Sequence, residues 1–394
     1  MSTVVTTQVP ARAVSLSLSR LDRIPWYTWM SVLAAACIMF GLYWDISWHE
    51  TIGRDTFWTP AHLLIQFGAV LAGIYSAYLI FSTTFASDRS ARSSSVRVLG
   101  FYGPLGAFIC AWGGVAMITS APFDNWWHEA YGLDVKIVSP PHTLLAMGFA
   151  AIMWGSITLI SGQMNRSSGD LRRRLEWLLL LAGGSMVVQD MLFKLEYTNR
   201  VLMHSGIFYL VTSIGLTLVW EGIARTSGRR WARTAMAGFY TIFFLLALWI
   251  FPLFSAEPKL GPVYQRVTHM ISLHFPVLIL PSALALDLLF QRIQDRDKWF
   301  QAVAGGVVFV AVLIAVNWPF ANFLMSPASR NWVFGTQQFA YFLNPTVASV
   351  RNVFFAWEQT TTHFLVNMGW ALVAGIVSTR VGITLGGWLQ RVQR

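Results

Sequence analysis

Ten long apolar stretches run through this chain of 394 residues, and they constrain its fold more than any other feature. Each holds about 18 to 25 residues, the length that an α-helix needs to cross a bilayer. Backbone groups in hydrocarbon must be hydrogen-bonded within their own segment, and no ten-residue alternating strand pattern appears. The sequence therefore predicts an all-α, polytopic membrane bundle. The predicted spans cover residues 27–44, 60–82, 99–120, 141–161, 175–193, 203–220, 234–254, 268–290, 300–318 and 361–380.

Basic residues gather in every second connection and predict the orientation of the bundle. Most of the 28 lysines and arginines lie in the two tails and in the connections at 87–97, 165–176, 224–233 and 291–298. Basic connections stay in the cytoplasm, so we expect both termini inside, in a bacterial cytoplasmic membrane, and the other connections outside. The net charge of +10 is then a topological signal. It gives no reason to expect a nucleic-acid partner.

The same pattern divides the chain into three regions. Residues 1–25 form a polar tail, which we expect to be retained in the cytoplasm. Residues 26–165 hold four spans, and residues 166–394 form the rest of the bundle, with a long aromatic-rich outer segment at about 319–360. That segment is typical of an interfacial aromatic belt, with a lid over an apolar substrate entrance as the alternative. Both cysteines lie in apolar runs, which argues against a disulfide framework.

Two polar stretches, each lying between neighbouring spans, are copies of one another. The first reads DISWHETIGRDTFWTPAHLL from Asp45, and the second reads DNWWHEAYGLDVKIVSPPHTLL from Asp124. Their Asp, Trp, His, Glu, Gly and second Asp match at a constant offset, and one inserted residue later a Pro and a His match again. This pattern indicates an internal duplication of a helix–loop–helix hairpin.

The spacing within each copy predicts a metal site at the edge of the membrane. If the first helix of the hairpin continues outward, Asp45 and His49 lie on one face of it, and a proline before His62 starts the next helix. A carboxylate and two imidazoles in a partly desolvated pocket are costly unless paired, and they suit copper, iron or zinc. The predicted ligands are Asp45, His49, His62, Asp124, His128 and His142. The residues expected to surround and orient them are Trp48, Glu50, Asp55, Trp127, Glu129 and Asp134.

The alternative is that each cluster is a salt-bridged or hydrogen-bonded group that only pins its hairpin, for instance through Asp55 with Arg54. On the predicted topology all eight histidines fall on the outer side, at or near the end of a span. The later hairpins therefore read as diverged copies or as polar walls of a shared outer vestibule, where Lys194 would repel a cation. Their weaker candidate ligands are Asp190, Glu196, His204, His269 and His274.

The first copy resembles the C subunit of the copper-containing membrane monooxygenases, the particulate methane and ammonia monooxygenases. That family carries an Asp-x3-His-x12-His copper-ligand set in a sequence similar to SWHETIGRDTFWTPAH of this chain, and a second site of the form Asn-x3-His-x13-His. Both spacings occur here in the same order over about residues 44–145, with Asp124 at the position of the family's asparagine. The resemblance implies copper at Asp45, His49 and His62, and a second metal position in the other copy. Nothing here resembles the family's soluble cupredoxin-like subunit.

These observations favour an oxidoreductase in which copper at the outer membrane edge activates dioxygen and oxidises a small or lipid-soluble substrate. The expected partners are membrane lipid and either further copies of the chain or other monooxygenase-type subunits, and no electron donor is visible. One alternative is a metal-handling protein or transporter, because tandem hairpins with polar residues at membrane depth are typical of secondary transporters. Against it, few charges lie inside the spans, Asp287 being the main one. The other is a structural subunit whose metals stabilise a larger membrane complex.

Overall fold

The computed structural model of the chain describes residues 23–53, 58–87, 90–93, 95–132, 139–198, 202–259, 267–324, 326–335, 358 and 360–393. Within these residues the chain is mostly helical, and one two-stranded hairpin is the only sheet. Nine helical stretches of the described chain are long and apolar enough to cross a membrane. The predicted all-α bundle is thereby confirmed, and the helices indicate an integral membrane protein.

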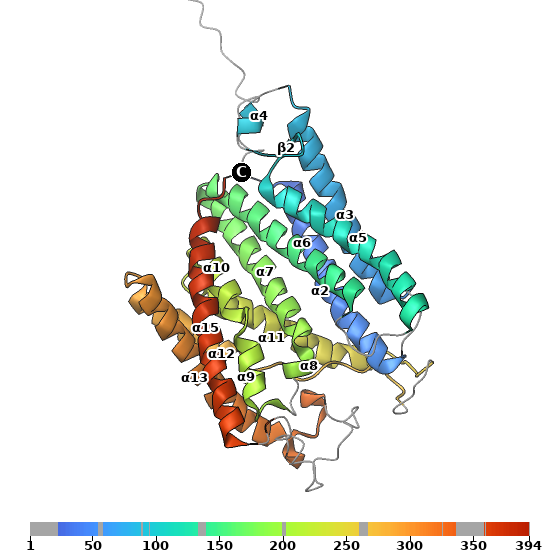
Figure 1. Cartoon of the computed structure of the whole chain (residues 1–394), viewed down its shortest axis with the longest axis vertical. Helices are drawn as coiled ribbons and strands as arrows, with labels where there is room; N and C mark the ends of the chain where they lie inside the picture. Colours follow the sequence, from blue (N-terminus) through green and yellow to red (C-terminus); the bar gives the residue numbers. More distant parts are fainter. Residues whose placement is uncertain are drawn as a thin grey trace, which may run out of the picture.

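The first four long helices form two antiparallel hairpins that pack side by side (Figure 1). They are α2 (Trp26–Thr51) with α3 (Pro60–Thr84), and α5 (Leu105–Tyr131) with α6 (Pro140–Asn165). Helix α3 lies against α5, so the two copies of the duplicated sequence share an interface. All four helices are longer than the predicted spans, and α2 and α5 continue far enough to carry the predicted ligands.

Small residues at matching positions hold each hairpin together. A Cβ atom on Gly68 of α3 would come within 2.8 Å of the Ala34 carbonyl oxygen on α2, and one on Gly148 of α6 within 2.9 Å of the Gly113 carbonyl oxygen on α5. Close backbone contact at small residues is typical of helix pairs in membranes. Because Gly68 and Gly148 occupy equivalent places in the two copies, the duplication extends from the polar residues into the packing of the helices.

The remaining helices form the second part of the bundle, which α7 joins to the first hairpins by packing against α2 and α6 as well as α10 and α11. Helix α15, red in Figure 1, runs along α10 and α13 and ends near the C terminus. The elements are α7 (Gly169–Phe193), α8 (Leu195–Thr198), α9 (Gly206–Ser213), α10 (Leu216–Ser227), α11 (Ala232–Ile250), η2 (Phe251–Leu253), α12 (Leu280–Ile293), α13 (Lys298–Leu324), η3 (Pro327–Ser329), η4 (Trp332–Phe334) and α15 (Thr361–Leu389).

The third predicted span, at 99–120, begins too early. Before α5 the chain forms α4 (Ser90–Ser93) and an antiparallel hairpin of β1 (Val96–Val98) and β2 (Phe101–Gly103). Leu99 and Gly100 both have positive φ and reverse the chain between the strands, as a two-residue hairpin turn requires. Pro104 then occupies the N-cap position of α5 in an extended conformation. Residues 99–103 therefore form the turn and the second strand of a β-hairpin, not the start of a helix.

The sixth predicted span, at 203–220, is interrupted near its middle. Helix α9 ends at Ser213, and Gly215, with a φ of +83°, separates it from α10. Beside the break, the Lys194 ammonium group donates to the Ile214 carbonyl oxygen and to the Asp190 carboxylate. A carbonyl group that the break removes from the helix thus receives a charged donor, as backbone at membrane depth requires.

The eighth predicted span, at 268–290, is wrong as a continuous helix. Its first half is non-helical, and only α12 in its second half is helical. Pro276 accounts for part of the difference, because proline has no N–H group and disfavours a helical conformation in the residue before it. Pro281 lies in the first turn of α12, where proline favours the start of a helix. Hydropathy does not register this effect, since the segment is as apolar as its neighbours.

Side chains of neighbouring helices bind the backbone of this non-helical segment. The N–H group of Leu273 donates to the Tyr43 hydroxyl group at 3.0 Å, and that of Val277 donates to the Tyr240 hydroxyl group at 3.0 Å. Hydrogen bonds from α2 and α11 therefore replace the missing helical ones, which makes irregular backbone tolerable inside the bundle.

The long outer segment also starts later than the predicted position at 319. Helix α13 continues through Pro319 to Leu324, and η3 and η4 follow it. Residues 336–357, which hold most of the aromatic-rich sequence, lie outside the described residues.

Candidate metal centre

The first predicted triad is positioned by the end of α2 and the start of α3. Asp45 and His49 lie one turn apart in the last two turns of α2. Thr59 caps the N-terminus of α3, its hydroxyl group accepting a hydrogen bond from the His62 N–H group at 3.1 Å, and Pro60 begins the helix. A capping threonine followed by proline fixes the direction in which α3 starts. His62 therefore projects from the first turn of α3 toward the end of α2.

The three side chains of this triad meet around one carboxylate oxygen. Oδ1 of Asp45 lies 3.0 Å from Nε2 of His62 and 3.6 Å from Nε2 of His49. One ligand atom from each residue lies within 4.8 Å of the others. Asp45 is the most protected of the three, with 16% of its side chain exposed against 25% for His62 and 35% for His49. The cluster is a half-buried pocket with a carboxylate at its inner side.

The second triad repeats this arrangement at the end of α5 and the start of α6. Oδ1 of Asp124 lies 3.6 Å from Nε2 of His128 and 3.8 Å from Nε2 of His142. Ser139 caps α6 as Thr59 caps α3, and its hydroxyl oxygen also lies 2.8 Å from Nδ1 of His142. The two imidazole ring centres are 6.5 Å apart, against 6.0 Å in the first triad.

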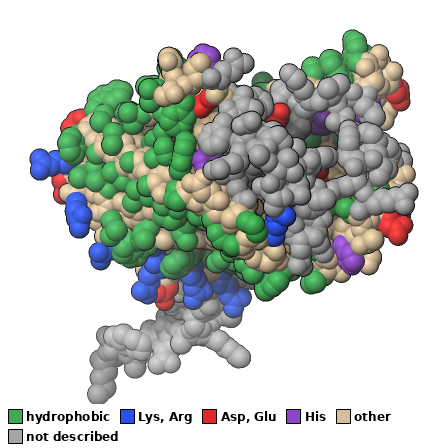
Figure 2. All heavy atoms as spheres, turned by 90° about the horizontal axis from the view of Figure 1, so that it is seen from below, with side chains coloured by type: hydrophobic (Ala, Val, Ile, Leu, Met, Phe, Trp, Pro, Cys, Tyr) green, Lys and Arg blue, Asp and Glu red, His purple; other side chains and the backbone are tan. Residues whose placement is uncertain are grey.

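The two triads differ in how tightly they are gathered. Among the described residues, only Asp45, His49 and His62 bring three ligand atoms within 4.8 Å of one another. The second triad, with Asp124 26% exposed, is slightly wider and more open to solvent. Both triads lie at the end of the bundle that Figure 2 views, where histidine side chains, in purple, appear at several separate places.

The donor set of the first triad fits a transition-metal ion. Two ligands bound to one ion through bonds of about 2.0 to 2.2 Å lie roughly 3 to 3.5 Å apart, close to the observed separations between Asp45 and the two histidines. Two imidazoles and one carboxylate suit copper, iron or zinc and leave positions open for another ligand. Nδ1 of His49 is buried without a hydrogen-bond partner among the described residues. A cluster held only by hydrogen bonds would leave this atom without a partner as well, so the atom does not distinguish the two interpretations. The distances between the ligand atoms are the stronger argument for a metal site.

The aromatic residues expected around the sites lie close to the ligands in sequence and pack among themselves. The Trp48 ring packs against Trp44 with ring centres 6.4 Å apart, and the Trp127 ring packs against Tyr131 at 4.5 Å. They form apolar walls along the last turns of α2 and α5. Each triad thus has large aromatic side chains on the same helical turns as two of its ligands.

Of the acidic residues expected to orient the imidazoles, the two that the structure describes form no hydrogen bond with a ligand imidazole. Glu129 accepts a hydrogen bond from the side-chain amide group of Asn125 at 2.9 Å, and Glu50 is an exposed residue of α2. Asp55 and Asp134 lie outside the described residues, so their predicted role stays a prediction. The described part of each site therefore consists of the triad and its aromatic neighbours.

The weaker candidates of the third hairpin do not form a ligand cluster among the described residues. Asp190 is bound by the Lys194 ammonium group at the break between α9 and α10. His204 is buried, and its ring packs edge-on against Trp318 with centres 4.8 Å apart. Glu196 belongs to the short helix α8. Lys194 was predicted to repel a cation, and in the structure it forms an ion pair with Asp190. This ion pair engages the carboxylate that a metal ion would need.

None of the remaining histidines belongs to a ligand cluster among the described residues. Nδ1 of His269 lies 2.9 Å from the Thr268 hydroxyl oxygen, at an exposed position. His274 lies in the non-helical segment before α12 and lines a cavity of about 10 Å³, enough for one water molecule. His363 follows the capping residue Thr360 as His62 follows Thr59, but it is exposed. It repeats the cap of the metal triads but forms no ion pair with a carboxylate of the described residues.

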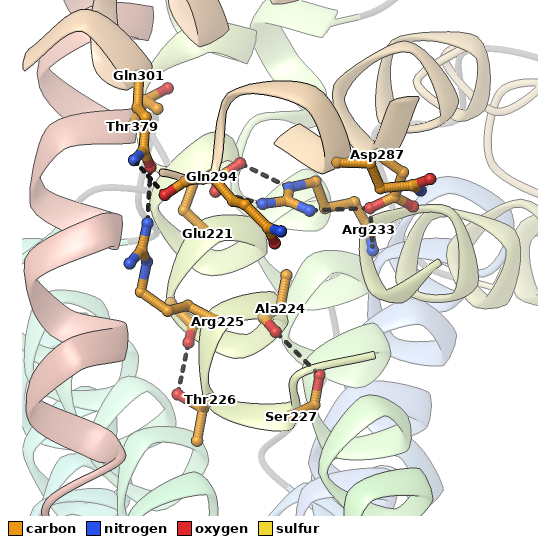
Figure 3. A network of polar contacts seen from close by, with 12 residues as sticks. Glu221, Ala224, Arg225, Thr226, Ser227, Arg233, Asp287, Gln294, Gln301 and Thr379 are labelled. Carbon is orange, nitrogen blue, oxygen red and sulfur yellow. Dashed lines mark hydrogen bonds and ion pairs between the residues drawn. The ribbon is translucent and has the colours of Figure 1, made fainter. Parts of the chain in front are cut away.

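A buried ionic network in the other half of the bundle was only partly visible in the sequence. Figure 3 shows the Arg233 guanidinium group between the carboxylates of Glu221 and Asp287, both fully buried. Arg233 donates to Glu221 at 2.6 and 2.5 Å and to Asp287 at 2.9 Å. Asp287 also accepts from the N–H and hydroxyl groups of Thr234, at 2.8 and 2.7 Å, so it caps α11. Arg233 belongs to a basic connection, and Glu221 and Asp287 each stand alone in an apolar run, so the sequence did not indicate that these three residues pair.

No protein-family model, curated protein or solved structure matches this chain. What the site does must therefore be inferred from its own residues. Their chemistry is that of a half-buried pocket with two imidazoles, one carboxylate and an aromatic border, present in two copies.

Proposed function

We propose that this chain is a membrane-embedded copper-binding protein of the monooxygenase type, which oxidises a small or lipid-soluble substrate with dioxygen. The observation that carries the proposal is the pair of Asp/His/His triads assembled by two duplicated helical hairpins. Duplication would copy a structural pin as well, but a pin needs only one favourable contact and gives no reason for both copies to keep all three residue types and the same caps. A shared ligand explains the repetition directly.

Copper is the metal that the ligand set and the family resemblance jointly favour, although iron or zinc would accept the same donors. When bound, copper would supply one-electron chemistry and activation of dioxygen. The residues have separate roles in this proposal. Asp45 supplies negative charge that favours a cation, while His49 and His62 supply neutral nitrogen donors from two different helices. Asp124, His128 and His142 would hold the second metal in the same manner.

The surroundings of the triads support an apolar substrate. Trp126 and Tyr131 are 53% and 68% exposed at the end of α5, beside the second triad. Exposed aromatic side chains at the end of a spanning helix are typical of the membrane interface. A lipid-soluble molecule could reach the pocket along this surface without crossing bulk water. In this proposal the electrons come from a separate donor, and any further subunits are separate chains.

The test is oxygen uptake by the copper-loaded protein in nanodiscs, with a lipid-soluble quinol as reductant. We expect copper-dependent uptake that His49→Ala removes. The matched control is His363→Ala, because His363 has the same capped position at a helix start but forms no ion pair with a carboxylate of the described residues, and uptake should persist there. Uptake that survives His49→Ala and His128→Ala together would overturn the proposal.

A copper or proton-coupled transporter is the second candidate, because the second part of the bundle has two interrupted crossings and buried charges. The break at Gly215 and the non-helical segment before α12 are features of transporters, and Glu221, Arg233 and Asp287 lie inside the bundle. The expectation that the interior carries few charges therefore needs correction. Copper accumulation inside proteoliposomes, together with no oxygen uptake, would favour this candidate.

A further inference from the structure

The tip of the β1–β2 hairpin carries a leucine where a leucine is costly. Leu99 has a φ of 49°, and among the described residues it is the only non-glycine residue with a positive φ. It occupies a turn position that normally takes asparagine, aspartate or glycine, because other side chains are strained there. It is also 94% exposed. Neither the turn nor the packing within this chain explains why an apolar side chain stands at this position.

Apolar side chains extend from this tip to the end of α3. Phe101 packs against Phe81 with ring centres 5.7 Å apart, and Phe81 stacks on Phe85 at 6.3 Å. Phe85 is 74% exposed. Leu99 lies two residues before Phe101 in the same hairpin, and we define the apolar tip as Phe81, Phe85, Leu99 and Phe101.

The tip is held against α3 by hydrogen bonds and lies near the boundary of the hydrocarbon core. The Thr84 hydroxyl group, at the last turn of α3, accepts from the Tyr102 N–H group at 2.8 Å and lies 3.0 Å from the Tyr102 carbonyl oxygen. Helix α3 is 25 residues long, which is roughly 37 Å and exceeds the hydrocarbon thickness of about 30 Å. Because this excess is shared between the two ends of α3, the apolar tip lies close to the boundary between the acyl chains and the headgroups, at the opposite end of α3 from the metal triad.

The other face of the hairpin is positively charged. Arg97 pairs with Tyr102 across the strands, and the guanidinium carbons of Arg92 and Arg97 lie 5.5 and 5.7 Å from the centre of the Tyr102 ring. Neither arginine forms an ion pair with a carboxylate of the described residues. Nε of Arg92 is buried and lacks a hydrogen-bond acceptor there. The Arg92 guanidinium group also donates to the Thr84 carbonyl oxygen at 2.6 Å, and Arg97 is exposed. Two guanidinium groups beside an apolar tip are suited to an anion that carries its own apolar part.

We propose that this hairpin binds an anionic phospholipid, with the Leu99 tip among the acyl chains and the phosphate group on Arg92 and Arg97. Charge complementarity supports this occupant, because the hairpin belongs to the basic end of the bundle and the cytoplasmic leaflet is anionic. Burial in lipid also removes the cost of exposing a leucine to water. The inference is independent of the metal centre and of its function.

The first test locates the tip with a spin label on Leu99→Cys in nanodiscs that contain phosphatidylglycerol. We expect the label to be accessible to oxygen and shielded from a water-soluble nickel complex. Accessibility to the nickel complex would overturn the proposal, and so would protection from both reagents, since that indicates a protein partner. The wild-type chain, treated identically, measures background labelling at Cys37 and Cys110.

The second test measures phosphatidylglycerol retained on the detergent-purified protein by native mass spectrometry. Leu99→Asn relaxes the turn, so thermal stability in detergent should hold or rise while retention falls at least about threefold. Replacing Arg92 and Arg97 together by glutamine should lower retention similarly. Arg174→Gln is the matched control, because Arg174 is an exposed arginine elsewhere at the basic end. Equal retention in the Leu99→Asn and control proteins would overturn the proposal.

Discussion

At the scale of single residues, one aspartate organises each triad. Oδ1 of Asp45 contacts imidazoles that come from two helices, so its charge decides whether the pocket attracts a cation. Without that charge, the two neutral imidazoles would still approach each other but would hold a divalent ion less firmly. Asp124 has the same place in the second hairpin, with slightly longer separations.

The change Asp45→Asn tests this role while conserving the shape of the side chain. We expect copper affinity at the first site to fall at least about 10- to 100-fold, because one anionic ligand is lost. Competition titration with a copper chelator measures the effect. Asp124→Asn is the matched variant, and it should weaken the second site while the first is unchanged. An unaltered titration in Asp45→Asn would show that the carboxylate is not a ligand.

At the scale of elements, the sequence predicted the features that depend on residues close together in the chain. It did not predict the features that depend on contacts between distant helices. The turn spacing of Asp45 and His49 and the proline before His62 are local signals, and the predicted triads do come together. The non-helical segment before α12 depends instead on Tyr43 and Tyr240, hydroxyl groups from distant helices. Its proline, Pro276, was the overlooked local signal. Likewise, the ion pair between Glu221 and Arg233 could not be predicted without knowing that α10 lies beside α11.

The buried network that joins α10, α11 and α12 leads to a prediction about stability. Arg233→Met should destabilise the protein by about 3–5 kcal/mol, because Glu221 and Asp287 would remain buried without their partner. Thermal unfolding in detergent measures this change. The exposed Arg174→Met variant should stay within about 0.5 kcal/mol of wild type. Equal unfolding temperatures for the two variants would mean that the network contributes little to stability.

At the scale of the whole molecule, the two parts of the bundle differ in character. The first consists of two regular hairpins that repeat a ligand triad, whereas the second contains the interrupted crossings and the buried charges. Basic connections and the lipid-binding hairpin lie at one end, and the triads lie at the other. This separation is what a protein would need if metal chemistry at one membrane face were kept apart from anchoring at the other.

The central claim is that both triads bind copper, and metal analysis of the nanodisc-purified protein tests it most directly. Copper, iron, zinc and manganese would be quantified together in the wild-type chain, His49→Ala, His128→Ala, the double variant and the His363→Ala control. We expect about two copper ions per chain in the wild type and control, about one in each single variant and none in the double variant. Copper content that is the same in all five proteins, or no copper after copper-replete expression, would contradict the claim.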